Sequence, residues 1–336
     1  MRVKLGDSTY EWIDDWAKIP PTETARNGWA HHGMAVSERG FVTSFHQEDR
    51  TLLAFDPEGT LLRSHKTDLT EGHGMTLVKE GETEYLWMAD NGSKRQSSLG
   101  YEYPPDAQKT SGRVVKMDLE GRILRELPKP DDARYQQTRF SPTSVAVDEE
   151  RFGGTGDIWV ADGYGLSLVH RFDKTGRHRG SVSGEEGKAG RFNTPHGVFI
   201  DRRRGRPELY VADRSNSRVQ VYDLEGRFIR SFGSDFLTSP SAFAVHGDLL
   251  IIAELRARLA VVDVDDHLVG YVGENEEVCD LDGWPNMKDS GGKTVRTDRL
   301  QPGKFNSPHG LAVDPSGNIY VAEWLIGGRH VKLQKT

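Results

Sequence analysis

The sequence predicts an all-β fold, a six-bladed β-propeller with the N-terminal strand closing the last blade. Two phrases recur along its 336 residues. The first, apolar and in four copies opening on histidine-glycine, begins at His32, His73, Thr143, His196, Ser241 and His309. The second ends in an acid in five copies, at Asp90, Asp162, Asp213, Glu254 and Glu323. Four short alternating segments in each unit, at a spacing of roughly 40–50 residues, are typical of propeller blades.

The ends of the chain complete the sixth blade. After the last acidic phrase the sequence offers one more strand, at residues 329–333, and residues 10–13 supply an unassigned strand at the other end. Pairing the two closes the ring and protects two sheet edges that would otherwise invite aggregation. We therefore expect residues 1–336 to form a single propeller domain.

Composition narrows the class of protein. The net charge of −7 argues against a surface for nucleic acid, and no apolar stretch approaches the 18 residues of a membrane span. A lone cysteine, Cys279, rules out an intrachain disulfide and fits a reducing compartment. With no leader visible at the start, we expect a cytoplasmic protein whose partner is a small-molecule substrate.

The repeat geometry gathers histidines at one face. In an up-and-down blade the first strand starts, and the second ends, on the same face of the propeller. His73, His196 and His309 fall on blades two, four and six, so they are expected 120 degrees apart around the channel by the sixfold symmetry of the repeat. Three neutral histidines with an open fourth position predict a divalent transition-metal site, with Zn²⁺ the default and Fe, Mn or Co as alternatives.

The repeats PHGVFIDRRRGRPELYVADRSNSRVQVYD and PHGLAVDPSGNIYVAE resemble NHL repeats over nearly the whole chain. Within that superfamily the chain is most similar to the peptidyl-α-hydroxyglycine α-amidating lyase core. The resemblance implies zinc binding by His73, His196 and His309. It further implies that Tyr164, in VADGY, is the catalytic tyrosine and that Arg214, in VADRSNSR, is an active-site arginine.

Two departures from that family concern its substrate and its structural ion. The family's first-blade arginine is replaced by Gln47, which follows Phe45-His46, and the aspartate of its calcium site is replaced by Gly310. We therefore expect the metal site and the tyrosine to be retained, while the peptide substrate is not. A small metabolite would enter under the loop at residues 273–305, which has a glycine hinge that suits a lid.

Further residues are candidates at the same face. His46 is a candidate for proton transfer, and His32 for a substrate contact, a second layer around the metal, or repeat consensus alone. We expect substrate or supporting contacts from Gln47, Glu254, Glu323 and Trp324, whereas Asp90, Asp162 and Asp213 are expected to cap turns.

Three function classes follow. The first is a metal-dependent lyase or hydrolase in which Tyr164 acts as general acid or base and Arg214 orients an anionic group. The second is an NHL-type interaction scaffold without catalysis. The third is a sugar-lactone-type hydrolase, whose calcium site would need several carboxylate ligands where this chain presents histidines.

Overall fold

The structure, a computed structural model, describes residues 1–107 and 109–336, and the described residues form six antiparallel blades, of which five have four strands and one has five. The prediction of an all-β six-bladed propeller is thereby confirmed. The chain divides into two compact units of three blades each. The first unit comprises Met1–Asp68, Lys94–Pro104 and Ser241–Thr336, and the second comprises Leu69–Ser93 and Pro105–Pro240.

The second unit contains blades two, three and four. Their strands are β7 (Gly72–Glu80), β8 (Thr83–Asp90), β9 (Arg113–Met117), β10 (Ile123–Glu126), β11 (Ser144–Val147), β12 (Ile158–Asp162), β13 (Leu168–Phe172), β14 (His178–Val182), β15 (Pro195–Asp201), β16 (Glu208–Asp213), β17 (Arg218–Tyr222) and β18 (Phe228–Phe232). The second strand of blade three is buried at every residue because neighbouring blades cover both of its faces. Trp159 and Tyr222 join the core between blades three and four.

The first unit contains blades one, five and six and the short helix α1 (Glu23–Asn27). Its blade strands are β3 (Met34–Val36), β4 (Val42–Phe45), β5 (Thr51–Phe55), β6 (Leu61–Lys66), β19 (Pro240–His246), β20 (Leu249–Glu254), β21 (Arg258–Val262), β22 (Leu268–Val272), β25 (Pro308–Val313), β26 (Ile319–Glu323) and β27 (Arg329–Lys335). Thr22 caps the helix by accepting a hydrogen bond from the backbone N–H of Ala25.

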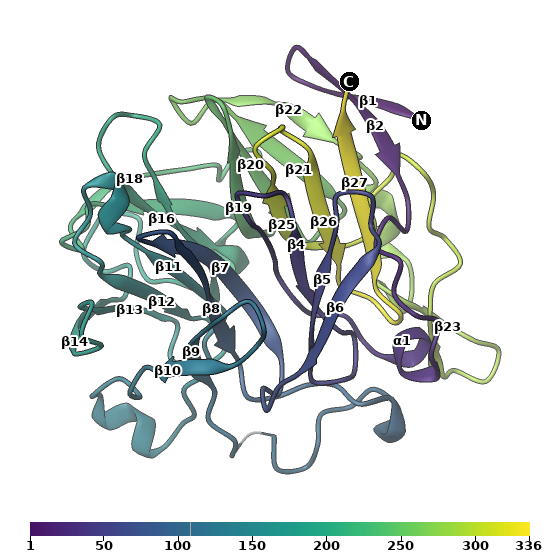
Figure 1. Ribbon diagram of the computed structural model, residues 1–336, viewed down its shortest axis with the longest axis horizontal. Coiled ribbons are helices and arrows are strands. Elements are labelled where there is room, and N and C mark those ends of the chain that lie inside the picture. The colour runs from purple at the N-terminus through teal and green to yellow at the C-terminus, as the bar shows by residue number, and fades with distance from the viewer. Residues whose placement is uncertain (108) are drawn as a thin grey trace. The chain divides into compact units, whose positions relative to one another are not determined.

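The N-terminal strand closes blade six as predicted. Strand β2 (Ser8–Ile13) pairs antiparallel with β27, placing Tyr10 opposite Lys335, and Figure 1 shows the purple strand beside the yellow one. Trp12 on β2 packs its ring 4.6 Å from that of Phe305. The sequence did not predict β1 (Arg2–Leu5), which folds back on β2 as a fifth strand of this sheet.

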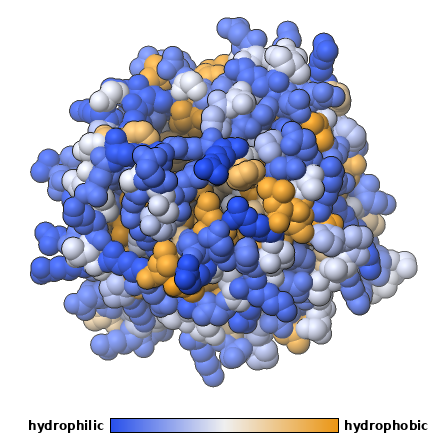
Figure 2. All heavy atoms as spheres, viewed as in Figure 1, coloured by the Kyte–Doolittle hydropathy of each residue, from blue (hydrophilic) through white to orange (hydrophobic). Residues whose placement is uncertain are grey.

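The long loops contain short elements of their own. Single 3₁₀ turns occur at η1 (Ser97–Leu99), η2 (Ala133–Gln136), η3 (Glu150–Phe152), η4 (Arg214–Asn216) and η5 (Glu276–Asp280), and a small hairpin joins β23 (Met287–Lys288) to β24 (Thr294–Val295). Hydrophilic side chains cover most of the face seen in Figure 2. Among the described residues, no helix is long and apolar enough to cross a membrane.

Candidate functional site

The three predicted ligand histidines share a local distortion of the first strand of their blades. The strand register shifts between Gly72 and Gly74 around His73, between Pro195 and Val198 around His196, and between Pro308 and Gly310 around His309. All three side chains are at most 3% exposed. A bulge of this kind turns a side chain away from its regular direction, and such bulges are frequent beside active sites.

The glycine after the histidine has a packing role. A Cβ on Gly74 would lie 2.3 Å from the carbonyl oxygen of Thr143, and one on Gly310 would lie 2.6 Å from the Cα of Gly33. Both distances are far shorter than a real Cβ contact allows. In these two blades the histidine-glycine phrase therefore combines a turned imidazole with close approach of the neighbouring backbone.

In the second unit, Tyr164 lies between two of the predicted ligands. Its hydroxyl oxygen is 3.3 Å from Nε2 of His73 and 3.0 Å from Nε2 of His196. Arg214 donates a hydrogen bond of 3.3 Å to the same oxygen, and its guanidinium lies over the phenol ring. All four residues were predicted, and the structure brings them together around one oxygen atom.

The hydrogen bonds of His73 and His309 fix their tautomers. Nδ1 of His73 lies 2.6 Å from the carbonyl of Thr143, and in the first unit Nδ1 of His309 lies 3.2 Å from the carbonyl of His32. A carbonyl only accepts, so each Nδ1 carries the proton and each Nε2 presents a lone pair. This is the usual arrangement of metal-binding histidines, and both residues fit that role.

In the first unit His309 has a companion that the sequence analysis missed. The ring of His31 lies 4.6 Å from that of His309 and 6.1 Å from that of Trp324, a predicted contact residue that is half-buried here. His32 instead faces His330, with 3.1 Å between their Nε2 atoms. Burial lowers the pKa of His32 well below its usual value, and that of His330 to about 4.

His31 rather than His32 lies beside His309 because the first strand of blade one starts later than those of the other blades with histidine-glycine. In blade one β3 begins only at Met34, and its pairing with β4 shows no bulge. The residue before the glycine therefore turns away from the direction taken in blades two, four and six. The histidine doublet at 31–32 was the available signal, but residues outside a strand have no alternation that tells which of them faces the site.

Asp162 holds the loop that carries Tyr164. Its carboxylate accepts hydrogen bonds from the backbone N–H groups of Ser141 (2.7 Å) and Leu166 (2.6 Å), the capping role predicted for it. A Cβ on Gly165 would lie 2.3 Å from this carboxylate, so only glycine fits beside it. The aspartate and the glycine together fix the loop from which the phenol projects.

A buried chain of hydrogen bonds continues behind Asp162. The hydroxyl of Tyr135 donates to Asp162 (2.6 Å) and lies 2.8 Å from Nε2 of His170, whose Nδ1 is 2.7 Å from the hydroxyl of Ser181. Burial, with a smaller effect of His178, lowers the pKa of His170 to about 3. Burial also raises the pKa of Asp162 to about 6.

These shifts predict a pH dependence of stability. Because the folded pKa of His170 lies below its unfolded value of about 6.5, the folded state binds fewer protons and loses stability as the pH falls from 6.5 toward 3. Asp162 has the opposite effect, because its raised pKa favours the folded state at low pH. Asp162 is present both in the wild type and in a His170 variant, so its effect does not distinguish the two. We expect the free energy of unfolding of His170→Gln, measured by chemical denaturation, to fall less steeply with decreasing pH than that of the wild type. The difference in slope should be up to about 1.4 kcal/mol per pH unit. The exposed-site variant His267→Gln should follow the wild type, and identical limbs for His170→Gln and wild type would contradict the assignment.

The remaining predicted residues have structural partners in the first unit. Nδ1 of His46 accepts hydrogen bonds from the backbone N–H groups of Glu48 and Asp49. Glu323 accepts from the backbone N–H groups of Asn306 and Ser307 and pairs with Arg329, while Glu254 pairs with Arg258 at 2.6 Å. The longer acids thus take up the capping and pairing role that aspartate has in other blades.

Comparisons with known proteins agree with this fold. A model of the NHL repeat matches residues 305–330. NHL repeat-containing protein 3 of Mus musculus is 30% identical over 293 residues, covering 84% of this chain and 71% of that protein. A probable peptidyl-α-hydroxyglycine α-amidating lyase of Caenorhabditis elegans is 23% identical over 317 residues, covering 87% of this chain and 79% of that protein. Among solved structures, virginiamycin B lyase from Staphylococcus aureus has a TM-score of 0.54 at 11% identity, covering 97% of this chain and 99% of that one, a likeness of fold alone.

Proposed function

This chain belongs to the family of NHL repeat-containing proteins, and we propose that it is a metal-dependent lyase or hydrolase acting on a small polar metabolite. One observation carries the proposal. A single phenol oxygen, that of Tyr164, contacts Nε2 of both His73 and His196 and accepts a hydrogen bond from Arg214. Three polar groups that converge on one phenol oxygen are typical of a site for acid–base chemistry rather than of a blade core.

The proposed metal ligands are His73, His196 and His309, with His31 as a fourth candidate. The Nδ1 bonds of His73 and His309 support this choice because they leave neutral Nε2 atoms to bind a cation. Nitrogen ligands favour a transition metal, zinc first, over calcium. When bound, such a metal supplies a Lewis acid that polarises a hydroxyl or carbonyl oxygen of the substrate.

The side chains around the phenol have separate roles in this proposal. Tyr164 takes up or delivers the proton at its hydroxyl, which is the atom that faces both imidazoles. Arg214 binds an anionic group of the substrate or stabilises negative charge that develops beside the phenol. Asp162 acts on Tyr164 only through the backbone, by holding the loop in place.

The substrate class rests on what replaces the first-blade arginine. Gln47 has a neutral amide, and it is engaged with the carbonyl of Gly327. We therefore favour a small metabolite that bears a hydroxyl, carbonyl or carboxylate over the peptide substrate named for the nematode relative. With one cysteine in the chain, we place this activity in the cytoplasm.

Metal analysis of protein purified without a histidine tag tests the proposal. We expect about one zinc or iron per chain, since a three-histidine site takes one ion. Bound calcium would favour the sugar-lactone-type hydrolase. Absence of metal from folded wild-type protein would favour the interaction scaffold without catalysis. Robust turnover of a peptidyl-α-hydroxyglycine would show that the substrate is the peptide and overturn the metabolite assignment.

A further inference from the structure

A cavity in the first unit is lined by a half-buried guanidinium with which no described carboxylate forms an ion pair. Its volume is about 600 Å³, and it is lined by residues around α1, by Gln47, by the 327–330 segment and by Arg296 from the long 273–305 loop. None of the residues so far given a catalytic role lines it. Gln47 also supports the substrate class proposed above, but ligand binding in this cavity requires neither the metal nor Tyr164.

Arg296 is the central residue of this cavity. Its guanidinium donates hydrogen bonds of 2.6 Å to the carbonyls of Ile326 and Gly328, which are neutral groups. In the described part of the chain no carboxylate forms an ion pair with it, although the exposed Asp15 lines the same cavity. Burial lowers the pKa of the guanidinium, an effect that Asp15 and Glu323 oppose and Arg329 reinforces.

The charge of Arg296 is therefore only partly compensated. A guanidinium carries five N–H donors, and the two bonds to carbonyls use one terminal nitrogen, Nη1. The remaining donors form a planar fork of the kind that binds a carboxylate by two parallel hydrogen bonds. Two further arginines line the cavity: Arg26, which bonds the carbonyl of Pro21, and Arg329, which is neutralised by Glu323 and Asp14.

Gln47 adds an unmatched acceptor. The side chain is 3% exposed, and its Nε2 donates to the carbonyl of Gly327 at 3.0 Å. Its Oε1 is buried and accepts no hydrogen bond from any described residue. Leaving such an acceptor empty destabilises a protein, so a ligand N–H or O–H beside it would be stabilised.

Two glycines make room for these side chains. Gly327 and Gly328 both have positive φ values, +74° and +59°. A Cβ on Gly327 would lie 2.5 Å from Nη1 of Arg296, and one on Gly328 would lie 3.1 Å from Cγ of Gln47. The segment is thus shaped around the arginine and the glutamine, as expected for a built site rather than a packing fault.

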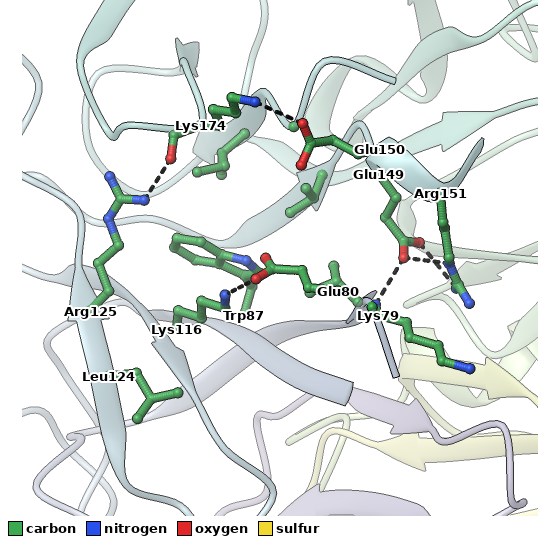
Figure 3. A pocket seen from close by; sticks show the side chains of 15 residues that line it. Lys79, Glu80, Trp87, Lys116, Leu124, Arg125, Glu149, Glu150, Arg151 and Lys174 are labelled. Atoms are coloured by element: carbon green, nitrogen blue, oxygen red, sulfur yellow. Dashed lines mark hydrogen bonds and ion pairs between the residues drawn. The ribbon is translucent and has the colours of Figure 1, made fainter. Parts of the chain in front are cut away.

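A second cavity, in the second unit, serves as a contrast because its charged side chains pair with one another. It measures about 720 Å³, and Figure 3 shows its basic and acidic side chains paired around Trp87. The ion pairs are Lys116–Glu80 (2.5 Å), Lys174–Glu150 (2.8 Å) and Arg151–Glu149 (2.7 Å), and Arg125 donates to the carbonyl of Lys174. Among its described lining residues no buried acceptor lacks a partner, so this cavity gives no comparable signal.

We propose that the Arg296 cavity binds a small carboxylate that carries a hydroxyl or amide N–H next to the carboxyl group. The guanidinium of Arg296 pairs with the carboxylate, and Oε1 of Gln47 accepts the adjacent donor. Glycolate is the smallest molecule that has both groups, and acetate has only the first. Inorganic phosphate is an anion without the geometry of a carboxylate and serves as the competing anion.

Binding of glycolate, acetate and phosphate to the full chain, measured by isothermal titration calorimetry, tests this site. We expect glycolate to bind more tightly than acetate or phosphate. Arg296→Gln should weaken glycolate binding by about tenfold or more, the usual effect of losing a charge-assisted bond. Arg299→Gln, in the same loop but outside the cavity, should bind as the wild type does. Gln47→Leu should remove the preference for glycolate over acetate.

The variants separate this site from a bound metal, which could also attract a carboxylate. Glycolate binding that survives Arg296→Gln but is lost in His196→Ala would overturn the inference, as would phosphate binding more tightly than glycolate. Absence of glycolate binding to the wild type would do the same. If Arg296→Gln does not fold, Arg296→Lys keeps the charge without the fork and should bind glycolate more weakly than the wild type; equal binding would contradict the proposal.

Discussion

Replacing His196 with alanine is expected to remove the bound metal while the six blades remain folded. Nε2 of His196 faces the phenol oxygen of Tyr164 in the same way as Nε2 of His73, so both imidazoles are available to one ion. Loss of a residue that hydrogen-bonds to a metal ligand weakens metal binding by about 10–100-fold, so loss of a ligand itself should weaken binding by more than this. Metal content after dialysis, measured by mass spectrometry, gives the result directly.

The fold should tolerate this change because the side chain lies in a bulge rather than in the blade core. The pairing of β15 with β16 resumes at Val198, and the apolar contacts of the blade involve Val198 and Ile200. We expect the circular dichroism spectrum of His196→Ala to match that of the wild type. His267→Ala, at an exposed turn, is the matched control and should retain the metal. Unchanged metal content in His196→Ala would rule out His196 as a ligand.

The blade pattern was predictable because it is repeated and local. Each apolar phrase forms the first strand of a blade, and each acidic phrase forms the second. Both were predictable because the alternation of apolar and polar residues along a strand is a pattern of neighbouring residues. The closing strand around Tyr10 was predictable for a related reason: a blade with three strands needs a fourth. Strand β1 was not, because among the described strands it pairs with β2 alone and it completes no blade.

The candidate site was predictable only where the repeat fixes orientation. His73 lies at the start of a first strand, and Tyr164 and Arg214 follow the ends of second strands. In an up-and-down blade these positions share a face, so their meeting follows from the blade geometry. His31 was missed because the chain before β3 has no strand register. The Arg296 cavity joins α1, Gln47, a long loop and the 327–330 segment, which are far apart in sequence, and no periodic pattern links them. A guanidinium whose charge is only partly compensated can be recognised only when its surroundings are known.

Replacing Tyr164 with phenylalanine is expected to retain the metal and to lower turnover by about two to four orders of magnitude, the usual contribution of a positioned acid–base group. The change removes one oxygen and leaves the ring, so the contacts of the aromatic face with Arg214 and His73 persist. Turnover is measured on whichever molecule of a panel of α-hydroxy acids and a peptidyl-α-hydroxyglycine is consumed by the wild type. Tyr85→Phe, elsewhere in the second unit, should behave as the wild type.

Two further measurements distinguish loss of a proton-transfer group from loss of structure. Metal content in Tyr164→Phe should equal that of the wild type, because the proposed ligands are the imidazoles and not the phenol. The pH–rate profile should lose the limb that titration of the phenol produces, a change that a packing defect would not cause. Near-normal turnover would instead make Tyr164 a packing residue. His46 would then be the better candidate, since its Nδ1 is held by two backbone N–H groups and its Nε2 is the nitrogen left to exchange a proton.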